Sequence, residues 1–143
     1  MQSQGIISLI SSIRDRANEL IGDLLAKRGI TGVVASHGSI FVSLFQEGPL
    51  SMSELAVKIG KKKNTVTVLV EKLTREGYVR VRKSPSDGRV TIVELTEKGE
   101  GFRGDFEEIS RVLLERVWGE MPLEERESLV AKLRVLAGNL AHR

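Results

Sequence analysis

Near the start of the chain, apolar residues recur at every third or fourth position, from Ile6 to Leu25. This spacing predicts an amphipathic helix that runs to about Lys27 and is ended by Gly29 and Gly32. The segment SHGSIFVSLFQEG, residues 36–48, repeats the same periodicity over a shorter distance. It predicts a second helix.

Two more helical patterns follow, separated by a short link that contains Gly60. In LSMSELAVKIG, Ser51 and Glu54 have the spacing of a capping box, which predicts a helix of about two turns. In KKKNTVTVLVEKLTREG, apolar residues that include Val66 and Val70 share one face. Two helices joined in this way are typical of a helix-turn-helix.

The next stretch changes from helical to alternating periodicity. YVRVRK alternates valine with arginine, VTIVEL is rich in β-branched residues, and SPSDG between them has turn chemistry, so the pattern predicts a β-hairpin. Thr96 in LTEKG is a predicted N-cap. A long helix from about Glu97 to Trp118, a break near Met121-Pro122 and a last helix to about Leu140 complete the prediction.

Composition narrows the class of protein. The 143 residues, 41% of them apolar, suffice for one ordinary domain with helical extensions. The first apolar run is too short for a signal peptide or a membrane span, so we expect a cytoplasmic protein without a membrane partner. With no cysteine and only His37 and His142, neither a metal nor a cofactor is expected.

Positive charge is concentrated in the middle third of the chain. Residues 51–98 hold eleven Lys and Arg against six Asp and Glu, a surplus of five, whereas the remainder holds eleven against thirteen. This distribution favours a polyanion as the partner of the central segment. A solvated basic face is the alternative that charge alone leaves open.

Taken in order, these elements form a winged helix-turn-helix, and the chain resembles the multiple-antibiotic-resistance regulator (MarR) family of prokaryotic transcription factors. The resemblance rests on SELAVKIGKKKNTVTVLVEKLTREGYVRVRK, on Asp87-x-Arg89 and on LTEKG. It implies a mainly α fold with a small β-hairpin wing. We expect an N-terminal dimerisation helix in residues 1–30, the DNA-binding domain in 33–98 and C-terminal dimerisation helices in 99–143.

The resemblance also implies a homodimer, and the apolar stripes at both ends of the chain independently favour one. The alternative is that the end helices pack only on their own domain. Double-stranded DNA is the expected partner, bound in the major groove by the second helix of the helix-turn-helix and in the minor groove by the wing. The candidate DNA-binding residues are Lys61, Lys62, Lys63, Asn64, Thr65, Thr67, Val68, Lys72, Arg82, Asp87, Gly88 and Arg89.

Each candidate has an expected role. The residues at positions 64, 65, 67 and 68 would meet base edges or thymine methyl groups, and the four lysines would meet phosphates. Val68 stands where many family members carry an arginine, so the operator sequence cannot be inferred. Lysines at a helix start oppose the helix dipole, which favours a DNA phosphate there. In the alternative, these lysines are solvated and Asn64 caps a shorter helix.

The resemblance assigns minor-groove insertion to Arg89 and a positioning role to Asp87. It further implies release of DNA by a small aromatic or anionic effector, whose identity the sequence does not give. Gly101 and Gly104 would either loosen the joint between wing and dimerisation helices or, as we prefer, permit close helix packing. His37, though near the expected effector region, is expected to be structural.

No catalytic motif, phosphate-binding glycine loop or metal-ligand spacing occurs, so we expect no enzyme. The expected function is that of a sequence-specific regulator, by family default a repressor, on a pseudo-palindromic operator. Two alternatives remain: a winged-helix module that binds protein, and an architectural protein that binds DNA with little sequence preference.

Overall fold

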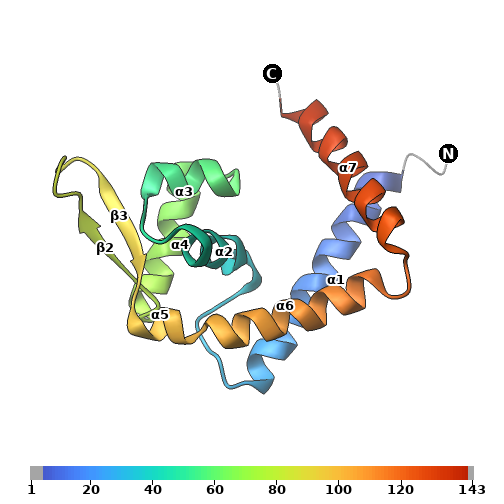
Figure 1. Ribbon diagram of the computed structural model, residues 1–143, viewed down its shortest axis with the longest axis horizontal. Helices are drawn as coiled ribbons and strands as arrows, with labels where there is room; N and C mark the ends of the chain where they lie inside the picture. The colour runs from blue at the N-terminus through green and yellow to red at the C-terminus, as the bar shows by residue number, and fades with distance from the viewer. Residues whose placement is uncertain (1–4, 142–143) are drawn as a thin grey trace.

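The computed structural model describes residues 5–141 of the chain, so His142 and the outermost residues of the two expected dimerisation segments lie outside it. The structure is mostly helical with one small sheet (Figure 1). Its elements are α1 (Ile6–Lys27), the 3-10 turn η2 (Ala35–His37), α2 (Gly38–Glu47), β1 (Leu50–Ser51), α3 (Met52–Ile59), α4 (Lys63–Arg75), β2 (Val79–Lys83), β3 (Thr91–Leu95), α5 (Glu97–Gly101), α6 (Arg103–Trp118) and α7 (Leu123–Leu140).

The sheet has the strand order β1-β3-β2, and both pairings are antiparallel. The predicted hairpin is present, with Val81 opposite Val93. Its inner strand, β3, also pairs with the two-residue strand β1, in which Leu50 lies opposite Val93. The third strand, which was not predicted, ties the start of the helix-turn-helix to the base of the wing.

The predicted caps form as expected. The Ser51 hydroxyl accepts from the Glu54 amide at 3.0 Å, and the Glu54 carboxylate accepts from the Ser51 amide at 2.8 Å. This capping box starts α3, and Gly60 ends the helix in the left-handed region with φ +67°. The helix-turn-helix therefore has the short, sharp link that its sequence predicts.

The core of the winged domain lies between α2, α3, α4 and the sheet. Its most deeply buried apolar side chains are Ile40, Phe41, Leu44, Leu55, Val66, Val70, Leu73, Val79 and Val93. An aromatic cluster extends this core onto α6, because Phe102 packs 4.8 Å from Phe41 between ring centroids and Phe106 packs 5.4 Å from Phe45. The winged domain is thus joined to the helix that leads away from it.

The expected long helix from Glu97 to Trp118 is divided in two at Phe102, which separates α5 from α6. Thr96 caps α5 through the Gly99 amide. Two further hydrogen bonds fasten the start of α5 to the turn after α4: the Thr96 hydroxyl donates to the Gly77 carbonyl, and Lys98 donates to the Glu76 carbonyl. These hydrogen bonds make the short helix α5 part of the winged domain.

The three glycines near this joint differ in their surroundings. At Gly99 a Cβ would lie 2.1 Å from the Tyr78 carbonyl oxygen, so this glycine is required by a close backbone approach. At Gly101 and Gly104 a Cβ would meet no atom within 4 Å. The preferred expectation, that these two glycines permit close packing against another helix, is therefore wrong for the helices of the same chain.

From this joint, α6 runs away from the winged domain and lies against α1, and the chain turns after α6 into α7 (Figure 1). Arg28, just after α1, and Asp105 of α6 form an ion pair at 2.9 Å. No residue of α7 is buried. Within residues 5–141, none of the helices combines the length and apolarity that a membrane crossing requires.

Candidate nucleic-acid interface

The second helix of the helix-turn-helix, α4, buries one face and exposes the other. Val66, Val70 and Leu73 are almost fully buried, and they fix the rotation of the helix on the core. By helical spacing, the stripe opposite to them is Asn64, Val68, Glu71 and Arg75. All four of these side chains are exposed, Val68 by 65%.

The start of α4 has no side-chain cap. Lys62 occupies the N-cap position with extended backbone but provides no acceptor, and the helix begins at Lys63. The Asn64 side-chain oxygen accepts from the Thr65 amide at 2.9 Å, inside the helix. The alternative of a shorter helix capped by Asn64 is therefore wrong, and exposed amides and lysines stand together at this helix end.

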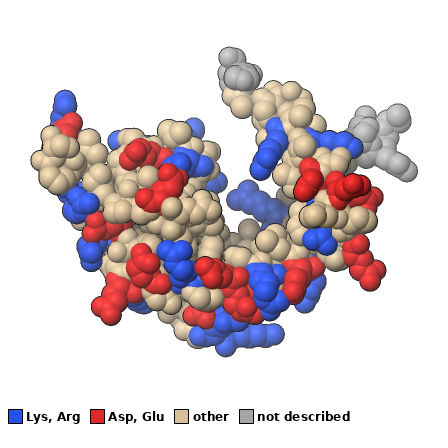
Figure 2. All heavy atoms as spheres, viewed as in Figure 1, with Lys and Arg blue, Asp and Glu red and all other residues tan. Residues whose placement is uncertain are grey.

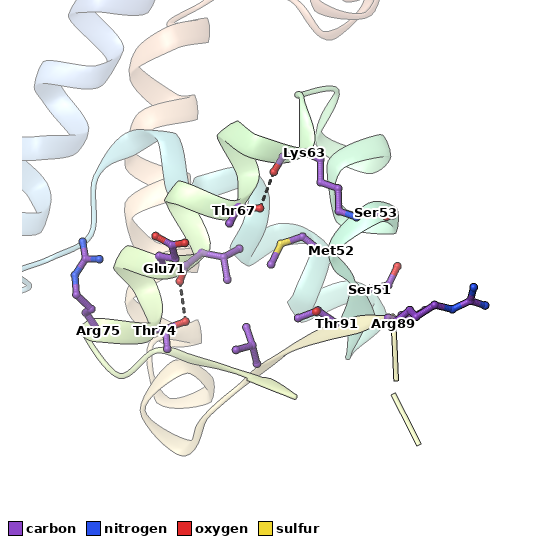
Figure 3. A pocket seen from close by; sticks show the side chains of 13 residues that line it. Ser51, Met52, Ser53, Lys63, Thr67, Glu71, Thr74, Arg75, Arg89 and Thr91 are labelled. Carbon is purple, nitrogen blue, oxygen red and sulfur yellow. Dashed lines mark hydrogen bonds between the residues drawn. The ribbon is translucent and has the colours of Figure 1, made fainter. Parts of the chain in front are cut away.

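A groove of about 610 Å³ separates α4 from the wing (Figure 3). Lys63, Thr67 and Arg75 line it from α4, and Arg89 and Thr91 line it from the wing. Its floor is completed by the start of α3. Of the predicted DNA-binding residues, those that the structure brings together in this groove are Lys63, Thr67 and Arg89.

The wing tip holds Arg89 in a defined geometry. Asp87 accepts three hydrogen bonds from it, from the amide at 3.0 Å, from Nε at 3.1 Å and from a terminal nitrogen at 3.2 Å. These bonds, first from the side chain and then from the backbone, lower the pKa of Asp87 below its ordinary value. The Arg89 side chain remains 91% exposed and points away from α4, out of the groove (Figure 3).

Other predicted residues lie elsewhere. Arg82 and Arg80 alternate with Val81, which lines the groove, so both arginines project from the opposite face of the hairpin. There each donates to Glu94 at 2.7 Å. On α4, Lys72 is half-buried on a flank of the helix. Thr65 shares that flank by helical spacing.

Sequence reasoning missed several residues of this surface. Ser51 and Ser53 at the start of α3, and Glu71, Thr74 and Arg75 of α4, also line the groove. Helical periodicity contained the signal for two of them, because Glu71 and Arg75 continue the stripe that begins with Asn64 and Val68. Nothing in the local sequence indicated the two serines, which the helix-turn-helix packing brings to the groove.

Lys and Arg groups lie at the wing tip with an acidic group beside them, and charges of both signs are interspersed over this face of the winged domain and along the edge formed by α5 and α6 (Figure 2). Within residues 5–141, no group of three His, Asp or Glu side chains could hold a metal ion.

A recognition helix with a free polar face, a basic hairpin beside it and helices at both ends define a winged helix-turn-helix protein of the transcription-regulator class. Residues 35–91 match the model of the MarR family. The chain belongs to the MarR family.

Known relatives agree with this assignment. The uncharacterized HTH-type transcriptional regulator YdgJ of Bacillus subtilis is 28% identical over 124 residues, which cover 86% of this chain and 74% of YdgJ. The HTH-type transcriptional repressor IacR of Pseudomonas putida is 32% identical over 97 residues, which cover 68% of this chain. The match spans 58% of IacR, less than two thirds of its length. Both relatives are transcriptional regulators, not enzymes.

Solved structures share the fold. The PcaV transcriptional regulator of Streptomyces coelicolor, crystallised in complex with its natural ligand, superimposes with a TM-score of 0.83. The superposition covers 94% of this chain and 92% of PcaV at 16% sequence identity. The agreement extends beyond the winged domain to the helices that flank it.

Proposed function

We propose that this protein is a sequence-specific DNA-binding transcriptional regulator, a ligand-responsive repressor that acts as a homodimer on a pseudo-palindromic operator. The observation that carries the proposal is the groove between α4 and the wing, which polar and basic side chains of α4 line and the exposed Arg89 at the wing tip borders. A helix of this kind fits the major groove of DNA, and an exposed arginine at a hairpin tip fits the adjacent minor groove. The repressor name of IacR supports the sign of regulation.

In this proposal the chain is divided as its sequence suggests, with residues 33–98 binding DNA and residues 1–30 and 99–143 forming the dimer. Asn64, Val68, Glu71 and Arg75 face the bases, because they form the exposed stripe of α4. Phosphates are bound at the uncapped start of α4, where exposed amides and three lysines coincide. The protein acts in the cytoplasm and catalyses no reaction.

The DNA immediately upstream of the chain's own reading frame is the first operator to test. Fluorescence anisotropy should compare it with a random duplex of equal length at several salt concentrations. We expect the upstream DNA to bind at least about 1,000-fold more tightly. Equal affinity for both duplexes at every salt concentration would indicate an architectural protein, and binding to neither would favour a protein-interaction module.

Two variants test the assigned roles in the same assay. Lys62→Ala should reduce the slope of log affinity against log salt by roughly one unit while leaving sequence preference unchanged. Arg89→Ala should weaken binding and reduce discrimination at A·T-rich flanks. Arg80→Ala is the matched control, because its guanidinium pairs with Glu94 on the other face of the wing. If Arg80→Ala and Arg89→Ala behave alike, minor-groove insertion by Arg89 is wrong.

A further inference from the structure

The first two turns of α4 contain a run of side chains that is unusual for a helix. Residues 65–68 read Thr-Val-Thr-Val, so four successive residues are β-branched. β-branched side chains are restricted at χ1, and valine in a helix has one strongly preferred rotamer. This restriction lowers helix propensity, but a side chain that is already rigid loses little entropy when it is fixed at an interface. This part of α4 is therefore suited to contact a partner.

Val68 is the member of this run that points directly away from the core. Val66 is fully buried, and Val68, two residues later, lies about 200° further round the helix. The side chain of Val68 is 65% exposed, and it stands in the exposed stripe of α4 between Asn64 and Glu71. Under the proposed function this stripe enters the major groove. Val68 would then bring two methyl groups to the edges of the bases.

Two polar side chains near Val68 are bonded to the backbone of α4. The Asn64 side-chain oxygen accepts from the Thr65 amide at 2.9 Å, and the Thr67 hydroxyl donates to the Lys63 carbonyl at 2.8 Å (Figure 3). Bidentate recognition of adenine by asparagine uses that oxygen together with the side-chain N–H, and the hydroxyl hydrogen of Thr67 is not free for a base acceptor. Apolar contact by Val68 is therefore the main means of base selection in these two turns.

The chemistry of the major groove decides which base a valine can select. Each base presents hydrogen-bonding groups there, and thymine adds a methyl group at C5. The methyl groups of valine satisfy no donor or acceptor, so thymine offers them a favourable contact. We propose that Val68 packs on the C5 methyl group of one thymine in each half-site and is the specificity-determining residue of the first two turns of α4. The inference rests on the proposed function and adds the identity of one base in the operator.

Selection of duplexes from a random-sequence library tests this inference with the full chain and needs no known operator. The parent protein should select a symmetric consensus with a thymine at one position of each half-site, and Val68→Ala should lose the preference at that position. Because Val68 is exposed and alanine has the higher helix propensity, this variant should fold. If both proteins select the same bases at every position, the proposal is wrong.

Replacing the selected thymine by deoxyuridine removes the methyl group and keeps every hydrogen-bonding group of the base pair. The affinity of the parent protein should fall by about fourfold for each half-site, the factor that corresponds to one methyl group left unburied. Val68→Ala should bind the two duplexes equally well. Val57→Ala is the matched control, because this valine of α3 is 83% exposed and lies outside the residues that line the groove. It should discriminate against deoxyuridine as the parent protein does.

The outcomes separate this inference from the proposed function. If selection gives no consensus, the protein is not a sequence-specific regulator, and both fail. If selection gives a consensus but the parent protein is insensitive to deoxyuridine at every thymine, the proposed function stands and the role of Val68 is wrong. An equal loss of affinity in the parent protein and in Val68→Ala would assign the methyl contact to another residue, and it would also overturn the inference.

Discussion

Arg89, which we propose enters the minor groove, is already oriented by its neighbours in the free protein. A free arginine side chain loses considerable conformational entropy when it is fixed at an interface. Here the two oxygens of Asp87 already hold its amide, Nε and one terminal nitrogen. If the wing binds DNA as proposed, this partial ordering in the free protein should reduce the entropy lost on binding. The Asp-x-Arg spacing thus has a local physical reason.

His37 is a buried ionisable residue of the winged domain. Its Nδ1 accepts from the Val34 amide at 3.0 Å and so caps η2, while Nε2 is buried without a hydrogen-bond partner among the described residues. Burial, and secondarily the charge of Lys72, lower the pKa of His37 below 6.5. The Leu69 carbonyl acts in the opposite direction, although it forms no hydrogen bond with Nε2. The expectation that His37 is structural agrees with this environment.

The lowered pKa gives a prediction for stability against pH. At pH values between the unfolded pKa of 6.5 and the lower pKa of folded His37, the imidazole of the unfolded chain binds a proton more readily than that of the folded chain. The free energy of unfolding therefore falls as the pH drops through this range. The slope for one group is at most about 1.4 kcal/mol per pH unit. Urea denaturation at pH 7.5, 6.5 and 5.5 should detect it.

His37→Asn removes the titration but keeps an acceptor for the Val34 amide. We expect this variant to be less stable at pH 7.5, because the smaller side chain leaves a cavity, but to lose less stability between pH 6.5 and 5.5 than the parent protein. The carboxyl groups whose pKa is lowered, such as Glu94, titrate below 4.5 and do not contribute in this window. Identical pH slopes for the two proteins would exclude His37 as the source.

At the scale of elements, the sequence predicts well wherever a local signal sets the structure. The start of α3 is determined by Ser51 and Glu54, and the start of α5 by Thr96, because in each case a side chain satisfies amides within three residues. The helical and alternating patterns depend equally on near neighbours. These signals are sufficient for the hairpin and for the α-helices, except that they do not predict the division between α5 and α6.

Features that depend on distant partners were not predictable. Strand β1 exists because Leu50 pairs with Val93, 43 residues further along. The break between α5 and α6 lies at Phe102, which packs on Phe41. Arg82 projects from the face of the hairpin on which it pairs with Glu94. In the candidate site, therefore, the wing tip and the exposed stripe of α4 could be inferred, whereas the contribution of α3 and the orientation of Arg82 could not.

The glycines of α5 provide a prediction at the same scale. Gly99→Ala should destabilise the protein by about 1 to 3 kcal/mol, because its Cβ would overlap the Tyr78 carbonyl. Gly101→Ala, two residues later in open space, should stabilise the helix by up to about 1 kcal/mol. Thermal unfolding of the two variants measures the contrast. Equal destabilisation by both would mean that the space around Gly101 is closed, for example by a partner subunit.

The same open positions bear on the hinge hypothesis. If the freedom of Gly101 and Gly104 is used to adjust the spacing of the two recognition helices, the double alanine variant should alter operator affinity or its response to ligand, even though it is more stable. If both properties are unchanged, the two glycines are not part of a functional hinge.

At the scale of the whole molecule, the helices at the ends of the chain expose apolar residues that a single subunit does not cover. In α7 the side chains of Leu129, Leu133, Leu136 and Leu140 lie on one stripe and are all exposed. In α1, Ile7 and Leu9 are more than 60% exposed. An open notch separates these helices from the winged domain (Figure 2). Burial against a second copy removes this surface from water.

Leu133→Glu tests this arrangement. A twofold interface contains this residue twice, and full burial of each leucine contributes about 1.5 to 3 kcal/mol. The dissociation constant of the dimer should therefore rise by roughly 100-fold or more. Sedimentation equilibrium should then show the 15.8 kDa monomer at concentrations where the parent protein is dimeric. Ala131→Glu, which adds the same charge on the opposite side of α7, is the matched control and should remain dimeric.

Failure of Leu133→Glu to dissociate the protein would mean that α7 is not central to the interface. In that case α1 and α6 would have to carry it. Operator affinity measured at the same concentrations shows whether two half-sites must be bound together.

Thr96 and Lys98 fasten α5 to the turn between α4 and β2, and this bears on how the protein would release DNA. Because these contacts tie α5 to the end of α4, we expect any bending at Phe102 to move α4 and the wing together. Under the proposed function, the exposed stripe of α4 and Arg89 would then leave a half-site of DNA at the same time.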